Sequence, residues 1–173
     1  MGWGSSDNVI TGNTVSDNGR GIYLEDSNNN SITGNTISNN DWEGIRLWYT
    51  SNNVIYLNNF INNADSVYSY DSTNIWNSTS QMTYTYEGGT YTNYLGNYWS
   101  DYTGSDADGD GIGDTPYSID GDKNYYPLME PFENYRLVPT PTPTPTPVPE
   151  FTSVALVVAA LAAILLVLRR LTS

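Results

Sequence analysis

The sequence predicts an all-β protein that begins with a parallel β-helix of about three coils. Three observations predict this fold: a repeat with a period of 22 to 23 residues, short apolar runs with strand periodicity, and asparagines that recur in register. Composition divides the chain into β-helix coils over residues 1–70, an irregular Asp- and Tyr-rich capping segment over 71–138, a Thr-Pro stalk over 139–149 and a membrane-anchoring segment over 150–173.

The repeat covers residues 5–70, and its first two copies are almost identical. Val-Ile-Thr-Gly-Asn-Thr-Val-Ser after Asn8 returns as Ser-Ile-Thr-Gly-Asn-Thr-Ile-Ser after Asn30, and a looser copy follows Asn53. Because a solenoid coil buries its apolar side chains only against its neighbours, equivalent residues should stack in columns. We expect two inward columns, formed by Ile10, Ile32 and Ile55 and by Val15, Ile37 and Phe60.

Apolar residues alternate with other residues within each coil, as in Ile-Tyr-Leu at 22–24 and Ile-Arg-Leu at 45–47. A period of two is typical of strands with one buried face. A leucine-rich repeat has a similar period, but it would need more leucine and a helical return stretch. Beyond residue 63 the register is open, because either Val67 or Tyr68 fits the position of Ile45.

Asparagine recurs at three positions of each coil. One interpretation is that these residues form corners, because Asn tolerates left-handed backbone and stacked amides can bond to one another in ladders. The other is an Asn-lined face that binds sugar. We favour corners for the three sets Asn8, Asn30 and Asn53; Asn13, Asn35 and Asn58; and Asn18, Asn40 and Asn63.

Composition excludes several classes of function. The chain has 19 acidic against 6 basic residues and no basic patch, so we do not expect a nucleic-acid partner. It has neither His nor Cys, which excludes Ser–His and Cys–His catalysis, disulfides and imidazole or thiolate metal ligands. Acidic residues of the coils do not recur at equivalent positions, so no column of catalytic carboxylates is expected. We therefore predict no catalytic residues and no enzyme activity for this chain.

Residues 105–114 carry the sharpest chemical signal, an Asp-rich loop of sequence Ser-Asp-Ala-Asp-Gly-Asp-Gly-Ile-Gly-Asp. Asp at positions 1, 3, 5 and 9 with Gly at position 6 is the spacing of an EF-hand calcium loop. Position 12 is Tyr117 instead of a bidentate Glu, and no flanking helices are predicted. The loop therefore resembles the helix-free loops of thrombospondin type 3 and dockerin-like repeats. A solvated acidic turn is the alternative. The expected Ca²⁺ ligands are Asp106, Asp108, Asp110, Asp114 and the carbonyl of Ile112.

The C-terminal part has three pieces. Alternating proline over 139–149 predicts an extended, semi-rigid stalk. Fifteen uninterrupted apolar residues over 154–168 then predict one transmembrane helix, and Arg169 and Arg170 favour a cytoplasmic C-terminus with the rest outside the cell. This C-terminal part resembles the PEF-type sorting signals of archaeal surface proteins, which combine a stalk, the motif found here as Pro149-Glu150-Phe151, an apolar segment and an arginine pair. That resemblance implies a sorting enzyme that acts near Pro149–Phe151.

Residues 5–131 resemble archaeal surface proteins with a NosD-type β-helix. The resemblance depends on the coils, on Gly-Asn-Tyr-Trp-Ser-Asp-Tyr at 96–102, on the Asp-rich loop and on Tyr-Pro-Leu at 126–128. The resemblance implies a right-handed, pectin-lyase-like β-helix. The family name also implies copper, but copper prefers imidazole and sulfur ligands, and the chain offers only Met1, Met82 and Met129. We therefore do not expect copper. The aromatic stretch 91–102 is either a sugar-stacking surface or a plug that covers the last coil, and we favour the plug.

Two functions remain. The first is a non-catalytic, membrane-anchored module of the cell surface, stabilised by calcium, with a structural, adhesive or carbohydrate-binding role toward an envelope polysaccharide or glycoprotein. The second is the C-terminal part of a carbohydrate-active lyase, hydrolase or epimerase whose catalytic coils lie upstream. No signal peptide precedes the repeat, which is already under way by residue 5, so we expect this chain to be the C-terminal part of a longer protein.

Overall fold

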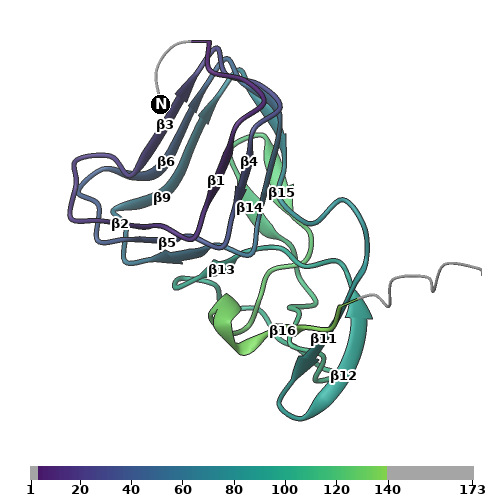
Figure 1. Ribbon diagram of the computed structural model, residues 1–173. Coiled ribbons are helices and arrows are strands. Elements are labelled where there is room, and N and C mark those ends of the chain that lie inside the picture. Colours follow the sequence, from purple (N-terminus) through teal and green to yellow (C-terminus); the bar gives the residue numbers. More distant parts are fainter. Residues whose placement is uncertain (1–3, 140–173) are drawn as a thin grey trace, which may run out of the picture. The chain divides into compact units, whose positions relative to one another are not determined.

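The structure is a computed structural model that describes residues 4–139 (Figure 1). Its first part is a parallel β-solenoid of three coils, and each coil contributes one strand to each of three sheets. The first sheet consists of β1 (Val9–Thr11), β4 (Ser31–Thr33), β7 (Ser51–Tyr56) and β10 (Thr73–Ile75). The second consists of β2 (Thr14–Ser16), β5 (Thr36–Ser38), β8 (Asn59–Ile61) and β13 (Tyr98–Trp99), and the third of β3 (Ile22–Glu25), β6 (Glu43–Trp48) and β9 (Asp65–Tyr70).

The register of the strands confirms both predicted columns. Ile32 pairs with Ile10 on one side and with Ile55 on the other. The second column stacks in the same way, since Val15, Ile37 and Phe60 are successive partners. All members of the second and third coils are fully buried, whereas Ile10 and Val15 of the first coil are half-buried.

The third column settles the register that the sequence leaves open. Val67 pairs with Ile45 and is buried, while Tyr68 pairs with Arg46 on the outer face of the sheet. The core is therefore a stack of β-branched and leucine side chains three layers deep, which suits their preference for a pleated, packed surface.

The recurring asparagines form three ladders along the solenoid. In the central ladder, Asn13 Nδ2 donates to Asn35 Oδ1 at 3.0 Å, Asn35 to Asn58 at 2.9 Å and Asn58 to Asn97 at 2.9 Å. Each Oδ1 also accepts the backbone N–H of the preceding asparagine, as when Asn35 N–H donates to Asn58 at 3.1 Å. Asn35, Asn58 and Asn97 are fully buried. The buried asparagines are therefore structural, because burial and ladder hydrogen bonds occupy their amides.

The predicted left-handed backbone lies one residue earlier than expected. Positive φ occurs at the residue before each of the nine predicted ladder asparagines, for example at Asp7 (59°), Asn29 (57°) and Asn52 (60°), and not at the ladder asparagine itself. The preceding residue makes the turn, which leaves the ladder side chain free to point inward and bond along the stack. Leu57 occupies the same kind of position with φ 52°, where the two earlier coils have glycine.

The last coil is closed by aromatic side chains, as expected for a plug. Trp99 stacks on Phe60 with ring centroids 4.3 Å apart, and Tyr117 stacks on the other side of Trp99, also at 4.3 Å. Trp76, from outside the stretch 91–102, packs beside Trp99 at 6.0 Å. Tyr117 belongs to a hairpin of β14 (Tyr117–Ile119) and β15 (Asp122–Asn124). The central ladder ends in that hairpin, because Asn97 N–H donates to Asn124 Oδ1 at 3.2 Å.

A second core lies beyond the plug and holds the rest of the cap. It is built on an antiparallel sheet of β12 (Gly89–Asn93), β11 (Met82–Tyr86) and β16 (Arg136–Leu137), with a 3₁₀ turn, η1 (Phe132–Asn134), before the last strand. Leu57 reaches this core from the third coil and joins its buried members Tyr84, Tyr86, Leu95, Ile112, Leu128 and Tyr135.

No helix among residues 4–139 is long and apolar enough to cross a membrane. The predicted stalk, transmembrane helix and sorting signal lie almost wholly within residues 140–173, outside the described part of the chain.

Candidate metal centre

The Asp-rich loop folds around the carboxylate of Asp106. This carboxylate accepts the backbone N–H groups of Gly109 at 2.8 Å, Asp110 at 3.2 Å and Gly111 at 2.8 Å. Gly109 and Gly111 both have positive φ, 72° and 87°, which lets the chain reverse within a few residues. The first predicted ligand is thus also the residue that shapes the loop.

Three of the five predicted ligands lie close together. Carboxylate oxygens of Asp106, Asp108 and Asp110 lie within 4.8 Å of one another. Asp108, Asp110, Ile112 and Asp114 line one hollow of about 210 Å³, together with Asn93 and Tyr126. Asp114 also closes the neck of the loop, because its Oδ2 accepts the N–H of Ala107 at 2.9 Å.

The loop is fixed to the second core by residues that the sequence spacing does not reveal. Tyr84 donates its hydroxyl hydrogen to the carbonyl of Asp110 at 2.9 Å, and Tyr135 donates to the carbonyl of Gly111. Asn93 Nδ2 donates to Asp110 Oδ2 at 3.0 Å. These partners come from β11, β12 and the stretch before β16, so only the folded cap brings them to the loop.

Gly111 sits where no side chain fits. A Cβ atom there would lie 2.8 Å from ring atoms of both Tyr86 and Tyr135. Ile112 beside it is buried in the second core and forms an antiparallel bridge with Leu128. The hydrogen bonds of this bridge use Gly111 and Gly113, so they involve neither the N–H nor the carbonyl of Ile112.

The loop concentrates negative charge without a cationic partner. Both ion pairs within residues 4–139 are formed by Glu43, so none of the loop carboxylates is paired with a base in the described chain. The neighbouring Asp110 carboxylate raises the pKa of Asp108 above its usual value. Burial, followed by the charges of Asp110 and Asp106, raises the pKa of Tyr84 as well. A divalent cation bound by oxygen ligands would remove this repulsion.

The coils offer no comparable carboxylate site. Asp7, Asp17 and Asp26 have positive φ and occupy exposed corners of the coils. Glu43 is engaged by two arginines, Arg20 at 2.9 Å and Arg46 at 2.7 Å. In glycosidases the two catalytic carboxylates face each other across the scissile bond. Within residues 4–70, Asp7, Asp17 and Asp26 instead serve turns, Glu43 serves ion pairs, and Glu25 accepts the hydroxyl hydrogen of Tyr23.

Comparison with known proteins gives one match. Neither curated proteins nor solved structures match the chain. The family described as periplasmic copper-binding protein (NosD) matches residues 1–104, which is more than half of the sequence. The match ends just before the Asp-rich loop, so the candidate metal centre lies outside the part of the chain that the family covers.

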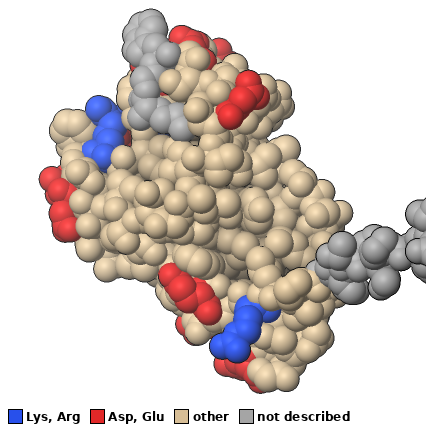
Figure 2. All heavy atoms as spheres, viewed as in Figure 1, with Lys and Arg blue, Asp and Glu red and all other residues tan. Residues whose placement is uncertain are grey.

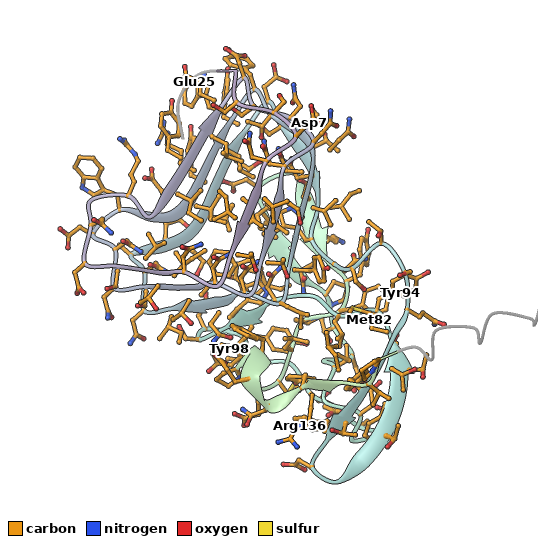
Figure 3. All side chains as sticks on the ribbon, viewed as in Figure 1. Asp7, Glu25, Met82, Tyr94, Tyr98 and Arg136 are labelled. Atoms are coloured by element: carbon orange, nitrogen blue, oxygen red, sulfur yellow. The ribbon has the colours of Figure 1, made fainter. Side chains whose placement is uncertain are left out.

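The copper in the family description does not fit the side chains present. The sequence contains no His and no Cys. Of its methionines, Met82 (Figure 3) and Met129 are half-buried, and Met82 packs against the second core. The candidate centre offers hard carboxylate oxygens, which suit Ca²⁺, Mg²⁺ or Mn²⁺ better than copper. The repeat, the three-coil parallel solenoid and the match over residues 1–104 together show that the chain belongs to the NosD family.

Proposed function

We propose that the protein is a non-catalytic β-helix module of the cell surface whose cap is stabilised by one Ca²⁺. The observation that carries this proposal is the convergence of Asp106, Asp108 and Asp110 within 4.8 Å in a loop tied to the second core. Without the bidentate Glu of an EF-hand, the affinity should be weak, with a dissociation constant on the order of 10⁻⁴ M, as in extracellular modules.

The role of the cation would be structural. Ca²⁺ would neutralise the Asp cluster at the place where Tyr84 and Tyr135 anchor the loop. The loop in turn joins the β13 end of the solenoid to the β14–β15 hairpin, which covers the last coil. Metal binding should therefore stabilise the cap and, through it, the end of the right-handed β-helix.

The surface location follows from the family and from the C-terminal sequence. The family description is that of a periplasmic protein, and a cell-surface module fits it. Residues 150–173 would anchor the module in the membrane, with the coils outside and the C-terminus in the cytoplasm until a sorting enzyme acts near Pro149–Phe151. A chain that ends at Pro149 should then leave the membrane fraction, and a truncated chain that still sediments with membranes would contradict the anchor.

The calcium proposal is tested by thermal unfolding of the full chain in EDTA and in about 10 mM CaCl₂, roughly 100 times the expected dissociation constant. Saturation to this degree adds about 2.7 kcal/mol of stability and should raise Tm by several degrees. The double variant Asp108→Asn, Asp110→Asn should lose this response. The control double variant Asp17→Asn, Asp41→Asn removes the same amount of charge from exposed coil corners and should keep the Tm response to CaCl₂.

Two results would contradict the proposal. The first is a wild-type Tm that is the same in EDTA and CaCl₂, which would leave the loop a solvated acidic turn. The second is an equal loss of response in both double variants, which would assign the effect to net charge and not to a site. MgCl₂ at the same concentration separates a calcium site from a general response to divalent cations.

A further inference from the structure

The outer face of the sheet β3-β6-β9 differs from the rest of the solenoid surface. Two outward columns run across its strands, and they contain only aromatic and charged side chains. Equivalent outward positions on β1 and β4 hold Val9, Thr11, Ser31 and Thr33. The aromatic columns are Tyr23, Arg46 and Tyr68, and Glu25, Trp48 and Tyr70.

The rings and the guanidinium group of this aromatic face are stacked against one another. Trp48 and Tyr70 stack with centroids 4.6 Å apart. Arg46 lies over both Trp48, at 4.9 Å, and Tyr68, at 4.4 Å. Tyr49 meets the Trp48 ring edge-on at 5.9 Å. Such mutual packing fixes the side chains in place before any partner binds, so less side-chain entropy is lost on binding.

Much of this ordered surface remains open to solvent. Tyr70 is 45 % exposed and Tyr49 46 % exposed. Trp42, which stacks under the guanidinium group of Arg20 at 4.6 Å, is 56 % exposed. Contiguous apolar surface that stays exposed on a folded protein often marks an interaction site.

The charges of the aromatic face cancel locally. Glu43 holds Arg20 at 2.9 Å and Arg46 at 2.7 Å, and Glu25 lies in the next column, so two positive charges meet two negative ones. Figure 2 shows a small patch of basic atoms on the flank where β3 and β6 lie, with acidic atoms nearby. The whole chain carries a net charge of −13. The face therefore has no positive field to attract an anionic polymer, and the molecule as a whole repels one.

We propose that the aromatic face binds a neutral glycan chain. The C–H faces of pyranose rings carry partial positive charge and stack on the negative faces of exposed rings such as Tyr70, which Trp48 supports by stacking against it at 4.6 Å. Sugar hydroxyls can bond to the planar groups of Arg46 and Glu25 at the edges of those rings. Tyr, Trp and Arg are also enriched at protein–protein interfaces, so contact with a second copy of the chain is one of the outcomes that the test separates.

This inference deepens the proposed function, on which it rests only for the access of the module to an extracellular glycan. None of the residues of the aromatic face belongs to the Asp-rich loop. Failure of glycan binding would therefore leave the calcium response intact, and failure of the calcium response would leave glycan binding intact.

The test titrates the full chain with hexasaccharides of β-1,4-linked glucose, N-acetylglucosamine and mannose, and with hexagalacturonate as the acidic counterpart. We expect at least one neutral hexasaccharide to change the tryptophan fluorescence and hexagalacturonate to leave it unchanged. Trp48→Ala and Tyr70→Ala, followed by calorimetry, should each weaken binding about tenfold. Ile75→Ala, which removes an exposed apolar side chain from the neighbouring sheet, should bind as the wild type does.

Several outcomes would overturn the proposal. They are no change in tryptophan fluorescence with any of the three neutral sugars, tighter binding of hexagalacturonate than of the neutral sugars, and unchanged affinity in both Trp48→Ala and Tyr70→Ala. A concentration-dependent dimer in sedimentation that Tyr70→Ala dissolves would assign the aromatic face to contacts between copies of the chain instead. Far-UV circular dichroism of each variant separates lost binding from lost folding.

Discussion

Truncation of Asn58 to alanine tests whether the amide ladder stabilises the solenoid. Asn58 is fully buried, and its side chain makes five hydrogen bonds. Its Oδ1 accepts from the backbone N–H and Nδ2 of Asn35, and its Nδ2 donates to the carbonyls of Ile32 and Tyr56 and to Asn97 Oδ1. Alanine would leave several of these buried groups without a partner, at about 1–3 kcal/mol each. We expect a total loss of about 3–5 kcal/mol.

Asn13→Ala is the matched control in the same ladder. The Asn13 side chain is exposed and donates to the carbonyl of Thr11 and to Asn35 Oδ1, which also accepts the Asn13 backbone N–H. Water can replace those bonds, so the expected loss is below about 1 kcal/mol. Urea unfolding followed by circular dichroism measures both variants, with a lower midpoint and an unchanged slope as the expected result.

Asn58→Asp separates hydrogen bonding from cavity formation, because it keeps the size of the side chain. It removes the two donors and turns a carboxylate toward three acceptor oxygens, so it should destabilise at least as much as alanine. The ladder argument fails if Asn58→Asp is tolerated, or if Asn13→Ala costs as much as Asn58→Ala.

Three further predictions concern the two cores. Gly111→Ala should cost about 2–3 kcal/mol, because its Cβ would meet aromatic rings at 2.8 Å, whereas Gly109→Ala, with nothing within 4 Å, should cost about 1 kcal/mol; equal urea midpoints would refute this. Burial raises the pKa of Tyr84 and Tyr135, so the folded state keeps protons that the unfolded state loses above about pH 10. The free energy of unfolding should then fall by about 1.4 kcal/mol per pH unit for each tyrosine. Urea midpoints that stay level between about pH 10 and 11.5 would count against this prediction. Ile32→Asp places an unpaired carboxylate in the central coil and should unfold the solenoid, so a melting curve like that of the wild type would show that this column is not core.

The coils could be predicted because two local signals agree. The alternation in residues 22–24 and 45–47 defines the inward face, and the 22–23-residue repeat defines which residues stack. The left-handed position could not be predicted, because pairs such as Asn29-Asn30 and Asn52-Asn53 offer two residues that tolerate positive φ equally well. Only the inward direction of the ladder amide distinguishes them.

The candidate metal centre was also predictable from the sequence only in part. The predicted ligands follow a fixed local spacing, and the carboxylates of Asp106, Asp108 and Asp110 lie within 4.8 Å of one another. The residues that anchor the loop follow no such local spacing, because Tyr84 and Tyr135 are 26 and 24 residues from the carbonyls to which they donate. The sequence predicts a plug over residues 91–102, which includes Trp99, whereas Trp76 and Tyr117 join the plug from outside that stretch. Long-range packing of this kind leaves no periodic trace in a sequence.

The asparagine ladders also give the solenoid an electrical direction. In the ladder of Asn8, Asn30, Asn53 and Asn74, the first three amides each donate to the next asparagine, so these side-chain dipoles are parallel and polarise one another. This ladder ends at Asn74, where Asp122 accepts the backbone N–H of Asn74 at 2.9 Å and the indole N–H of Trp76 at 3.2 Å. A carboxylate thus stands at the positive end of the array, as an acidic residue does at the N-terminus of a helix. Asp122 therefore contributes charge as well as shape to the closed end of the solenoid.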